Sequence, residues 1–569
     1  MILFRKTITM KQKIYIQLFS LALLLLNYSS LCAQDKNNFE ISKNIEIYVD
    51  ALRQLNLNYA DDINPGELNK TAIDAMLNKL DPYTIYVPES KLEDFELMTK
   101  GEYGGIGALI QKQGEYVVIT EPYEGFPAQK SGLKAGDKII AIDGESAKDK
   151  DTPEVSEKLK GVPGTNLVLI IESFGDTLKR EVEIIREKVK FPNIPYYGML
   201  DKEIGYISLM QFNPNAAADV KKAFNELKTD NNLKGIILDL RGNGGGLLNE
   251  AVDITNIFIP KGQTIVTTKG KLSENVRIHR TRNNAIDQKI QLVVLVNTNS
   301  ASASEIVAGA IQDLDRGVIV GERTFGKGLV QHVVPLPYNS KMKITVAKYY
   351  IPSGRCIQAI DYFNENGNGE HAKIPDSLLS SFKTKGGRTV HDGGGIIPDI
   401  CIDPAPFSQI TADLYANNYI FNYANSFVLK NNEIAEPENF VITDSIYADF
   451  KVFVTDEDFD YLTETESLIE RLKKSAERES YISVLADQIQ TVDSLVREEK
   501  KNDIKKFRSE IQDLLLLEIV GRYYYQKGKI IATIKSNPEI KEAINILSNN
   551  SLYTSILNGS YHKADCDKD

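Results

Sequence analysis

Short apolar strands alternate with helical segments over residues 188–405, and this alternation constrains the fold more than any other feature of the chain. The strand segments are GYISL, GIILDL, QLVVLVN and GVIVGE, all dominated by apolar residues. Amphipathic segments such as AAADVKKAFNELK and LLNEAVDITNIFI separate them. The pattern predicts βαβ crossovers, in which helices cover a buried sheet.

The rest of the chain differs from this block in its pattern of apolar and polar residues. Residues 99–187 consist of short strands and glycine turns around one short helix, TPEVSEKLKG, and predict a compact β-rich module. Residues 38–98 carry apolar residues at helical intervals, and residues 406–569 are mostly charged helix. The C-terminal extension is either a solvated helical region or a coiled-coil surface for a partner. With 569 residues, the chain is therefore predicted to be multidomain, of mixed α+β and α/β class.

The N-terminus has the features of a secretory signal peptide. Lysines precede the apolar run LFSLALLLL, and the polar stretch NYSSLCAQD follows it. The run is too short to span a bilayer comfortably, so we predict a signal peptide over residues 1–33, cleaved after Ala33, and an exported protein. Lipoprotein processing at Cys32 is the alternative, but Leu31 stands where a small residue is expected.

Net charge and cysteine spacing argue against some classes of partner and site. The net charge of −11 argues against a nucleic-acid partner, which needs a basic face. Three cysteines follow the predicted signal peptide, and none has the spacing of a metal site. A disulfide framework is not expected, and a bridge between Cys356 and Cys401 is left open.

The segment that starts at Asn299, NSASASEIVAGAIQDLDRGVIVGERTFGKGLVQ, suggests hydrolytic chemistry. Its three candidate nucleophiles are serines at the start of a small-residue helix, and Lys327 follows one strand later between two glycines. A lysine acts as a base for a serine when burial lowers its pKa, and apolar neighbours could provide that burial here. The alternative is an exposed lysine in a turn. The candidate nucleophiles are Ser300, Ser302 and Ser304.

Two other readings of this region are weaker. GERTFGKG matches a phosphate-binding loop through its lysine, but Gly328 replaces the hydroxyl residue that would hold magnesium. RGNGGG lacks the glycine spacing of a dinucleotide turn. The five histidines have no obvious aspartate partner, which weakens a Ser-His-Asp triad without excluding it.

Two glycine-rich segments could supply backbone amides to a ligand. GNGGG (242–246) follows a predicted parallel strand, where its amides could stabilise an oxyanion, although a plain strand-to-helix turn is equally compatible. YGGIGA (103–108) opens the β-rich module with successive amides that could hold a peptide's C-terminal carboxylate while the peptide pairs with a sheet edge.

Together these motifs resemble one known family, the carboxy-terminal processing (tail-specific) serine peptidases with an inserted PDZ domain. The resemblance covers roughly residues 40–405 and rests on GIILDLRGNGGGLLNEAV, VLVNTNSASASEIVAGAIQD and VGERTFGKGLVQ, which occur in the family's order. YGGIGA with SGLKAGDKIIAIDGE is similar to the PDZ portion, and YYIPSGRCIQ with GGGIIPDI to the end of the catalytic core. The resemblance implies a crotonase-like, ClpP-related core with an inserted PDZ module.

The resemblance also implies roles for individual residues. It makes Ser302 the nucleophile, Lys327 the general base and Gln331 the residue that orients the lysine. The oxyanion donors would be Gly245 and Ala303. Because Gly244 stands where many relatives have proline, the choice between Gly245 and Gly246 is left open. The PDZ carboxylate pocket would use the amides of Gly105, Ile106 and Gly107.

On this basis the expected domains are residues 1–33 (signal peptide), 38–98 (helical region), 99–187 (PDZ), 188–405 (Ser-Lys peptidase core) and 406–569 (helical extension). The expected function is that of an exported, periplasmic or cell-envelope, serine endopeptidase that acts on proteins recognised by their C-termini, with no metal or organic cofactor. An adaptor protein and a homo-oligomer are left open as partners. The alternative is a catalytically silent PDZ scaffold, which would be expected to have lost Ser302 or Lys327.

Overall fold

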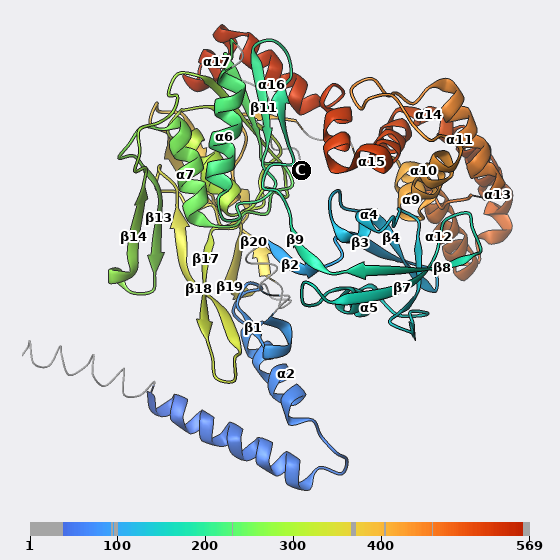
Figure 1. Cartoon of the computed structure of the whole chain (residues 1–569), viewed down its shortest axis with the longest axis horizontal. Helices are drawn as coiled ribbons and strands as arrows, with labels where there is room; N and C mark the ends of the chain where they lie inside the picture. Colours follow the sequence, from blue (N-terminus) through green and yellow to red (C-terminus); the bar gives the residue numbers. More distant parts are fainter. Residues whose placement is uncertain are drawn as a thin grey trace, which may run out of the picture. The chain divides into compact units, whose positions relative to one another are not determined.

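The computed structural model describes residues 38–561 except 93–94, 96–100, 230–231, 366–370, 403–405 and 458 (Figure 1). The chain forms two compact units, one up to Pro88 and one from Glu89 onward. The predicted signal peptide, with Cys32 and Ala33, lies outside the described residues.

The N-terminal unit is built from two helices and one short strand. Its elements are helix 38–58, α2 (Pro65–Leu77) and β1 (Ile85–Val87). The side chain of Asn64 caps α2 by accepting hydrogen bonds from the amides of Gly66 and Glu67. The two helices meet where the Tyr48 hydroxyl donates to Asn69 Oδ1 over 2.7 Å.

The β-rich module has the sheet order β3-β4-β5-β7-β8, with β6 on the edge of β5. A capping box of Asp151 and Glu154 starts its helix α5, as the segment TPEVSEKLKG predicted. Strands β2 and β9 pair at the two ends of the module, so the chain enters and leaves it at one place. The elements are β2 (Glu102–Gly105), β3 (Ala108–Gln113), β4 (Tyr116–Pro122), α4 (Pro127–Lys130), β5 (Lys138–Ile142), β6 (Glu145–Ser146), α5 (Thr152–Leu159), β7 (Asn166–Glu172), β8 (Lys179–Ile185) and β9 (Glu187–Lys190).

The alternating block folds around a six-stranded sheet of order β10-β11-β12-β15-β16-β23. β10 is antiparallel to β11 and all later neighbours are parallel, as the βαβ pattern predicted. Val293, at its centre, is fully buried between Ile237 and Val318. The strands are β10 (Tyr196–Met199), β11 (Ile204–Ser208), β12 (Gly235–Asp239), β15 (Gln291–Val296), β16 (Val318–Gly321) and β23 (Ile400–Cys401).

Helices cover both faces of this sheet. α6 (Ala216–Thr229), α7 (Leu248–Phe258) and α8 (Ala303–Asp313) pack on one face through a large apolar core. α16 (Pro538–Ser548) and α17 (Asn550–Leu557) pack on the other face, so the end of the chain returns to the sheet (Figure 1). The multidomain fold of mixed helix and sheet predicted from the sequence is therefore confirmed.

A second sheet stands beside the central one and carries the strands that follow Lys327. In it, β18 (Lys341–Tyr350) pairs with β17 (Leu329–Pro335) and with β13 (Thr264–Gly270), which pairs with β14 (Val276–Arg280). Two small hairpins complete this part of the chain, β19 (Ile360–Glu365) with β20 (His371–Lys373) and β21 (Ser381–Lys383) with β22 (Thr389–His391).

The predicted C-terminal extension is divided between two structures. Helices α9, α10, α11 and α15 enclose an apolar core of their own, which contains Leu414, Tyr423, Phe450 and Leu515, whereas α16 and α17 pack on the central sheet. The helices are α9 (Gln409–Ala416), α10 (Tyr419–Lys430), α11 (Asp444–Asp456), α12 (Glu464–Arg478), α13 (Ile482–Lys500), α14 (Asp503–Lys506) and α15 (Arg508–Ile534).

Helix α15 also holds the β-rich module. Glu121 on β4, which is 7% exposed, accepts hydrogen bonds from Gln526 Nε2 over 2.8 Å and from Lys529 Nζ over 2.5 Å. Close by, Gln129 Nε2 donates to the Tyr525 hydroxyl over 3.2 Å. Because a buried carboxylate needs such partners, these contacts fix the module against α15.

Replacing Lys529 with alanine is expected to loosen the module from α15. The change leaves the buried Glu121 carboxylate with one donor fewer, which costs about 1–3 kcal/mol. Hydrogen exchange at the β4 amides should therefore accelerate by roughly tenfold to a hundredfold. The control is Lys130→Ala, which breaks the exposed Lys130–Glu187 pair and should change exchange little. Equal protection of β4 in the Lys529 variant and the wild type would contradict this role of α15.

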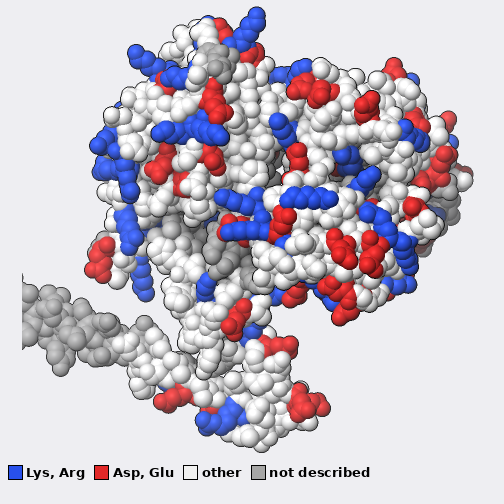
Figure 2. Space-filling model, viewed as in Figure 1, with Lys and Arg blue, Asp and Glu red and all other residues white. Residues whose placement is uncertain are grey.

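Acidic and basic side chains are interspersed over most of the described surface that Figure 2 shows. This agrees with the net charge of −11 and leaves no continuous basic groove on that face of the described residues. Within the described part of the chain, no helix has the length and apolar character needed to cross a bilayer.

The cysteines do not pair in the way that the sequence left open. Cys356 is a free thiol, whereas Cys401, at the end of β23, is disulfide-bonded. The bridge between Cys356 and Cys401 is therefore not formed. Burial raises the pKa of the Cys356 thiol, which makes it a poor nucleophile.

Candidate active site

Ser302 lies between β15 and α8, at the carboxyl end of a central parallel strand. Its φ of 56° and ψ of −109° cost on the order of 1–3 kcal/mol for a residue other than glycine. The following helix is buried along its whole length and holds this strained residue in place. Although the chain lacks a G-x-S-x-G motif, the geometry is the strained strand-to-helix turn that exposes a nucleophile.

Burial separates Ser302 from the other two candidate serines. Ser300 is fully buried, and its hydroxyl donates to the Leu240 carbonyl over 2.8 Å. Ser304 is also fully buried and donates to the Asn243 carbonyl over 2.8 Å. Ser302 is only partly buried and is the one of the three that lines a pocket.

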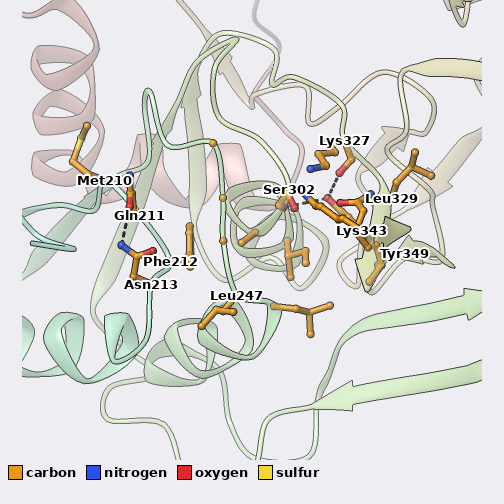
Figure 3. Close-up of a pocket in the computed structure, with 18 of the residues that line it drawn as sticks. Met210, Gln211, Phe212, Asn213, Leu247, Ser302, Lys327, Leu329, Lys343 and Tyr349 are labelled. Carbon is orange, nitrogen blue, oxygen red and sulfur yellow. Dashed lines mark hydrogen bonds between the residues drawn. The ribbon is translucent and has the colours of Figure 1, made fainter. Parts of the chain in front are cut away.

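Lys327 lines the same pocket, from the segment between β16 and β17 (Figure 3). It is partly buried, so it is not the exposed turn lysine of the alternative interpretation. Gly326 before it has a φ of 86°, and a Cβ there would lie 2.4 Å from the Ala359 Cβ, so this close turn requires glycine. A strand, not a helix, follows the lysine, which argues against a phosphate-binding loop.

The pocket has a volume of about 620 Å³, and both apolar and polar side chains line it. Gln331 lines it from β17, and its side-chain amide donates to Thr345 Oγ1 over 3.3 Å. Among the described residues that line the pocket there is no histidine. Apolar lining residues include Met210, Phe212, Leu247, Ile306 and Leu329.

Glu305 ties the serine and lysine segments together, a role that the sequence interpretation missed. Its fully buried carboxylate accepts from the amides of Ser302 (2.7 Å) and Lys327 (2.9 Å). The Gly326 amide (2.7 Å) and the Thr324 hydroxyl (2.6 Å) donate to its other oxygen. Burial raises the pKa of Glu305 from 4.5 to about 7, although these four donors oppose the rise.

Tyr349, on β18, makes a second bridge between the same two segments. Its hydroxyl donates to the carbonyls of Lys327 (2.6 Å) and Ser302 (3.1 Å), and the residue is 1% exposed. With Glu305 on the amides and Tyr349 on the carbonyls, the backbone on both sides of the site is fixed. The spacing between Ser302 and Glu305 is a helix-capping signal that could have flagged Glu305, whereas nothing local marks Tyr349.

The glycine turn approaches Ser302 closely at Gly245. This residue has a φ of 103°, and a Cβ there would lie 2.9 Å from the Ser302 Cβ and 3.0 Å from the Ala303 amide nitrogen. The Gly245 amide donates to Asn243 Oδ1 over 2.9 Å in this structure. Gly246 packs on Phe212 instead, because a Cβ there would lie 2.5 Å from the Phe212 carbonyl oxygen. Gly245 is therefore the glycine of this pair that lies beside Ser302, while its amide is engaged by the Asn243 side chain.

An ionic cluster anchors the strand that leads into this turn. Arg241 forms a 2.6 Å ion pair with Asp239 and a 3.3 Å ion pair with Glu539 of α16. The Tyr206 hydroxyl donates to the Asp239 carboxylate over 2.7 Å. The neighbouring carboxylates raise the pKa of Arg241 despite its burial. The turn is thereby tied to the last helices of the chain.

Of the predicted PDZ residues, Gly105 ends β2, and Ile106 and Gly107 connect it to β3; none of them lines the Ser302 pocket. The Ile106 carbonyl accepts from the Ala128 amide (2.7 Å), and the Gly107 carbonyl accepts from the Tyr123 amide (2.9 Å). Burial raises the pKa of Tyr103, and a backbone hydrogen bond from Gly107 opposes the rise. The tyrosine ring lies over Gly105, where a Cβ would be 2.7 Å from the Tyr103 Cε2. The loop is thus formed and covered by an aromatic side chain.

The described residues contain no cluster of three or more histidine, cysteine, aspartate or glutamate side chains able to hold a metal ion.

Three regions of the chain match known protein families. Residues 203–362 match the family described as "Peptidase family S41", and residues 118–173 match "PDZ domain". Residues 410–547 match "Probable PDZ-protease, C-terminal helical domain". These matches fall on the central sheet with its pocket, on the β-rich module and on the C-terminal helices.

Two curated relatives and one solved structure are similar to the chain. The "Carboxy-terminal-processing protease" of Bartonella bacilliformis is 34% identical over 344 residues, which are 60% of this chain and 78% of that protein. The "Probable CtpA-like serine protease" of Staphylococcus aureus strain MRSA252 is 36% identical over 307 residues, which cover 53% of this chain and 60% of that protein. The photosystem II D1 C-terminal processing protease structure is 30% identical, with a TM-score of 0.36, over 63% of this chain and 87% of its own.

Proposed function

The chain belongs to peptidase family S41, with the carboxy-terminal-processing proteases, and is a serine-type peptidase; from this premise we propose that it is an exported endopeptidase with a Ser302–Lys327 dyad. The observation that carries the proposal is burial. Of three neighbouring serines, the two fully buried ones bond to backbone carbonyls, and Ser302 lines one pocket with Lys327. The silent-scaffold alternative has no such observation in its favour.

The proposed reaction uses the side chains and amides of the pocket. Lys327 Nζ takes the proton of Ser302 Oγ as that oxygen bonds to the substrate carbonyl carbon. The amides of Gly245 and Ala303 stabilise the oxyanion, and Gln331 positions the lysine. Lys327 then gives the proton to the leaving amine, and water, activated by the same lysine, releases the acyl group from Ser302. The apolar wall of the pocket suits an apolar substrate side chain.

The substrates are proposed to be proteins recognised by their C-termini through the PDZ module. Gly105, Ile106 and Gly107 supply the amides of a carboxylate-binding loop at the start of β3, and β3 offers an edge to an extended tail. Tyr103 covers this loop, so a tail has to displace its ring to reach the Gly107 amide.

Amidating the C-terminus of an apolar-tailed reporter protein is expected to lower kcat/KM by at least roughly tenfold. The amide removes the charge that the loop would bind, while the scissile bond is unchanged. Steady-state cleavage of the two reporters by the full chain measures the difference. Equal kcat/KM values for both would reject tail recognition and leave the dyad untouched.

Export is proposed from the N-terminal signal and from the redox state of Cys401. Disulfides persist in oxidising compartments outside the cytosol, and Cys401 is disulfide-bonded. Cleavage after Ala33 would leave Gln34 as the first residue of the exported protein. A lipid on Cys32 would instead point to membrane anchoring, and N-terminal mass spectrometry of the secreted chain separates the two cases.

A further inference from the structure

A second lysine, Lys343, lines the Ser302 pocket and has no part in the proposed reaction (Figure 3). It lies on β18, directly opposite Val333 of β17. Successive side chains of a strand alternate between its two faces, so Val333 shares a face with Gln331. Both residues line the pocket, and Lys343 lines it beside them. The sheet therefore presents the side chain of Lys343 to the substrate cavity.

Lys343 is well separated from the groups that would break the peptide bond. Near the other end of β18 is Tyr349, whose hydroxyl donates to the carbonyls of Ser302 and Lys327. Tyr349 lies six positions after Lys343 on this strand, a span of about 20 Å at roughly 3.3 Å per residue. An extended substrate covers the same span with about six residues. The lysine is thus placed to contact the substrate at a distance from the scissile bond.

The charged side chains that line the pocket are positive. Among its described lining residues, Lys327 and Lys343 carry a charge, and none is an aspartate or a glutamate. The Glu305 carboxylate is directed elsewhere, since its oxygens accept from three backbone amides and the Thr324 hydroxyl. As a general base, Lys327 has to be neutral before it accepts the serine proton. At that stage Lys343 supplies the positive charge of the pocket lining.

A positive charge in a peptide-binding pocket favours a carboxylate of the substrate. Charge-assisted hydrogen bonds from an ammonium group to a carboxylate are about twice as strong as bonds between neutral groups. Lys343 is partly buried, so salt screens such a bond less than at an open surface. Peptides carry carboxylates on aspartate and glutamate side chains and at the C-terminus.

We propose that Lys343 is a specificity-determining residue that binds a carboxylate of the substrate within about six residues of the scissile bond. The inference rests on the proposed peptidase function and names a substrate feature that the same pocket recognises. It is separate from tail recognition, because the loop of Gly105, Ile106 and Gly107 does not line this pocket.

Glutamate and glutamine versions of one apolar-tailed reporter peptide test the inference. The pair is placed in turn at each position within about six residues of the cleaved bond, on both sides, while the tail is kept constant. At one position the full chain should show a KM about tenfold lower for glutamate, with kcat changed less than about threefold. Peptides that end within this range, with a free or an amidated C-terminus, show whether the carboxylate belongs to a side chain or to the chain end.

Substitutions of Lys343 test whether this residue is the cause of the preference. Lys343→Glu should reverse it, so that lysine at the same substrate position gives a KM about tenfold lower than glutamate does. Lys343→Arg retains the charge and should keep the preference. The matched control is Lys341→Glu, since Lys341 is also a partly buried lysine of β18 but does not line the pocket. It should keep the preference of the wild type, and cleavage of the glutamine peptide shows that each variant is folded.

Equal KM values at every position, for both sources of the carboxylate, overturn the inference, while cleavage of the peptides still upholds the peptidase function. A preference that survives in Lys343→Glu, or that Lys341→Glu reverses equally, also overturns it. A Lys343→Met variant with unchanged KM values and a shifted pH profile of kcat would assign Lys343 to the control of the Lys327 pKa and overturn it too. A wild type that cleaves none of the peptides rejects the proposed peptidase function and the inference with it.

Discussion

Replacing Ser302 with alanine is expected to lower kcat for peptide cleavage by at least about 10³-fold, because it removes the proposed nucleophile and the Tyr349 hydroxyl of the same pocket is bound to two backbone carbonyls. Tail binding should be unchanged, since the PDZ loop lies outside this pocket. Single-turnover cleavage and binding of an apolar-tailed reporter measure the two effects separately. Full activity of the alanine variant would remove Ser302 from the mechanism.

Replacing Lys327 with alanine is expected to cost about as much as replacing Ser302, because each residue is ineffective without the other. The double variant should then be no slower than either single one. Lys343→Ala is the matched control, since Lys343 is a second lysine that lines the same pocket (Figure 3). Its loss should act mainly on KM and change kcat less than about tenfold. An inactive Lys343 variant beside an active Lys327 variant would reassign the base.

The alternating strands and helices of residues 188–405 could be predicted because a buried strand requires a run of apolar residues, which is visible in the local sequence. The strand segments GIILDL and QLVVLVN became neighbouring parallel strands, and the segment AAADVKKAFNELK became α6. The sequence also suggested a small-residue helix that opens with the serine cluster, and α8 begins at Ala303 within that cluster. Because Ser302 immediately precedes the helix, it occupies the strained turn.

The choice among the three serines could not be made from local residues. Ser300 and Ser304 are fixed by bonds to the carbonyls of Leu240 and Asn243, some 60 residues earlier in the chain. The resemblance to a family supplied Ser302, and the long-range packing is consistent with that choice. The assignments of Ser302, Lys327, Gln331, Gly245 and Ala303 remain predictions, and all five residues line one pocket.

The surfaces against which the C-terminal helices pack could not be predicted from the sequence either. Periodicity identifies an apolar face on each helix but not the surface that covers it. Ile540 and Ile546 of α16 pack on the central sheet, and Arg241 bonds to Asn537 and Glu539 at the start of that helix. These contacts tie the last helices to the strand that leads into the glycine turn at residues 242–246.

Replacing Glu305 with glutamine is expected to lower kcat by about 10²–10³-fold without removing a group that touches the substrate. The carboxylate accepts from four donors, and an amide keeps one acceptor oxygen and adds a donor of its own. At least one of the amides of Ser302, Gly326 and Lys327 then loses its partner, at about 1–3 kcal/mol for each buried donor. The serine and the lysine should shift apart, and kcat should fall more than KM rises.

The matched control for this change is Glu466→Gln. Glu466 stands at the same helix position in α12, where it accepts from the Thr463 amide over 2.8 Å and is 4% exposed, but it lies outside the Ser302 pocket. Its loss should lower stability and leave kcat unchanged. If both glutamine variants lost activity equally, the effect would be one of stability and Glu305 would have no special role.

The pH dependence of stability gives a second readout for Glu305. Because burial raises its pKa from 4.5 to about 7, the folded protein holds a proton on this group between those pH values that the unfolded chain has released. The stability that this proton contributes is fully present below pH 4.5 and is lost as the pH rises to about 7. The melting temperature of the wild type should therefore fall more steeply than that of the Glu305→Gln variant across this range. Above pH 7 the ionised carboxylate can accept all four hydrogen bonds, so the serine and lysine segments stay joined although the protein is less stable.

If the melting temperatures of the two proteins changed with pH in the same way, Glu305 would not titrate in this range.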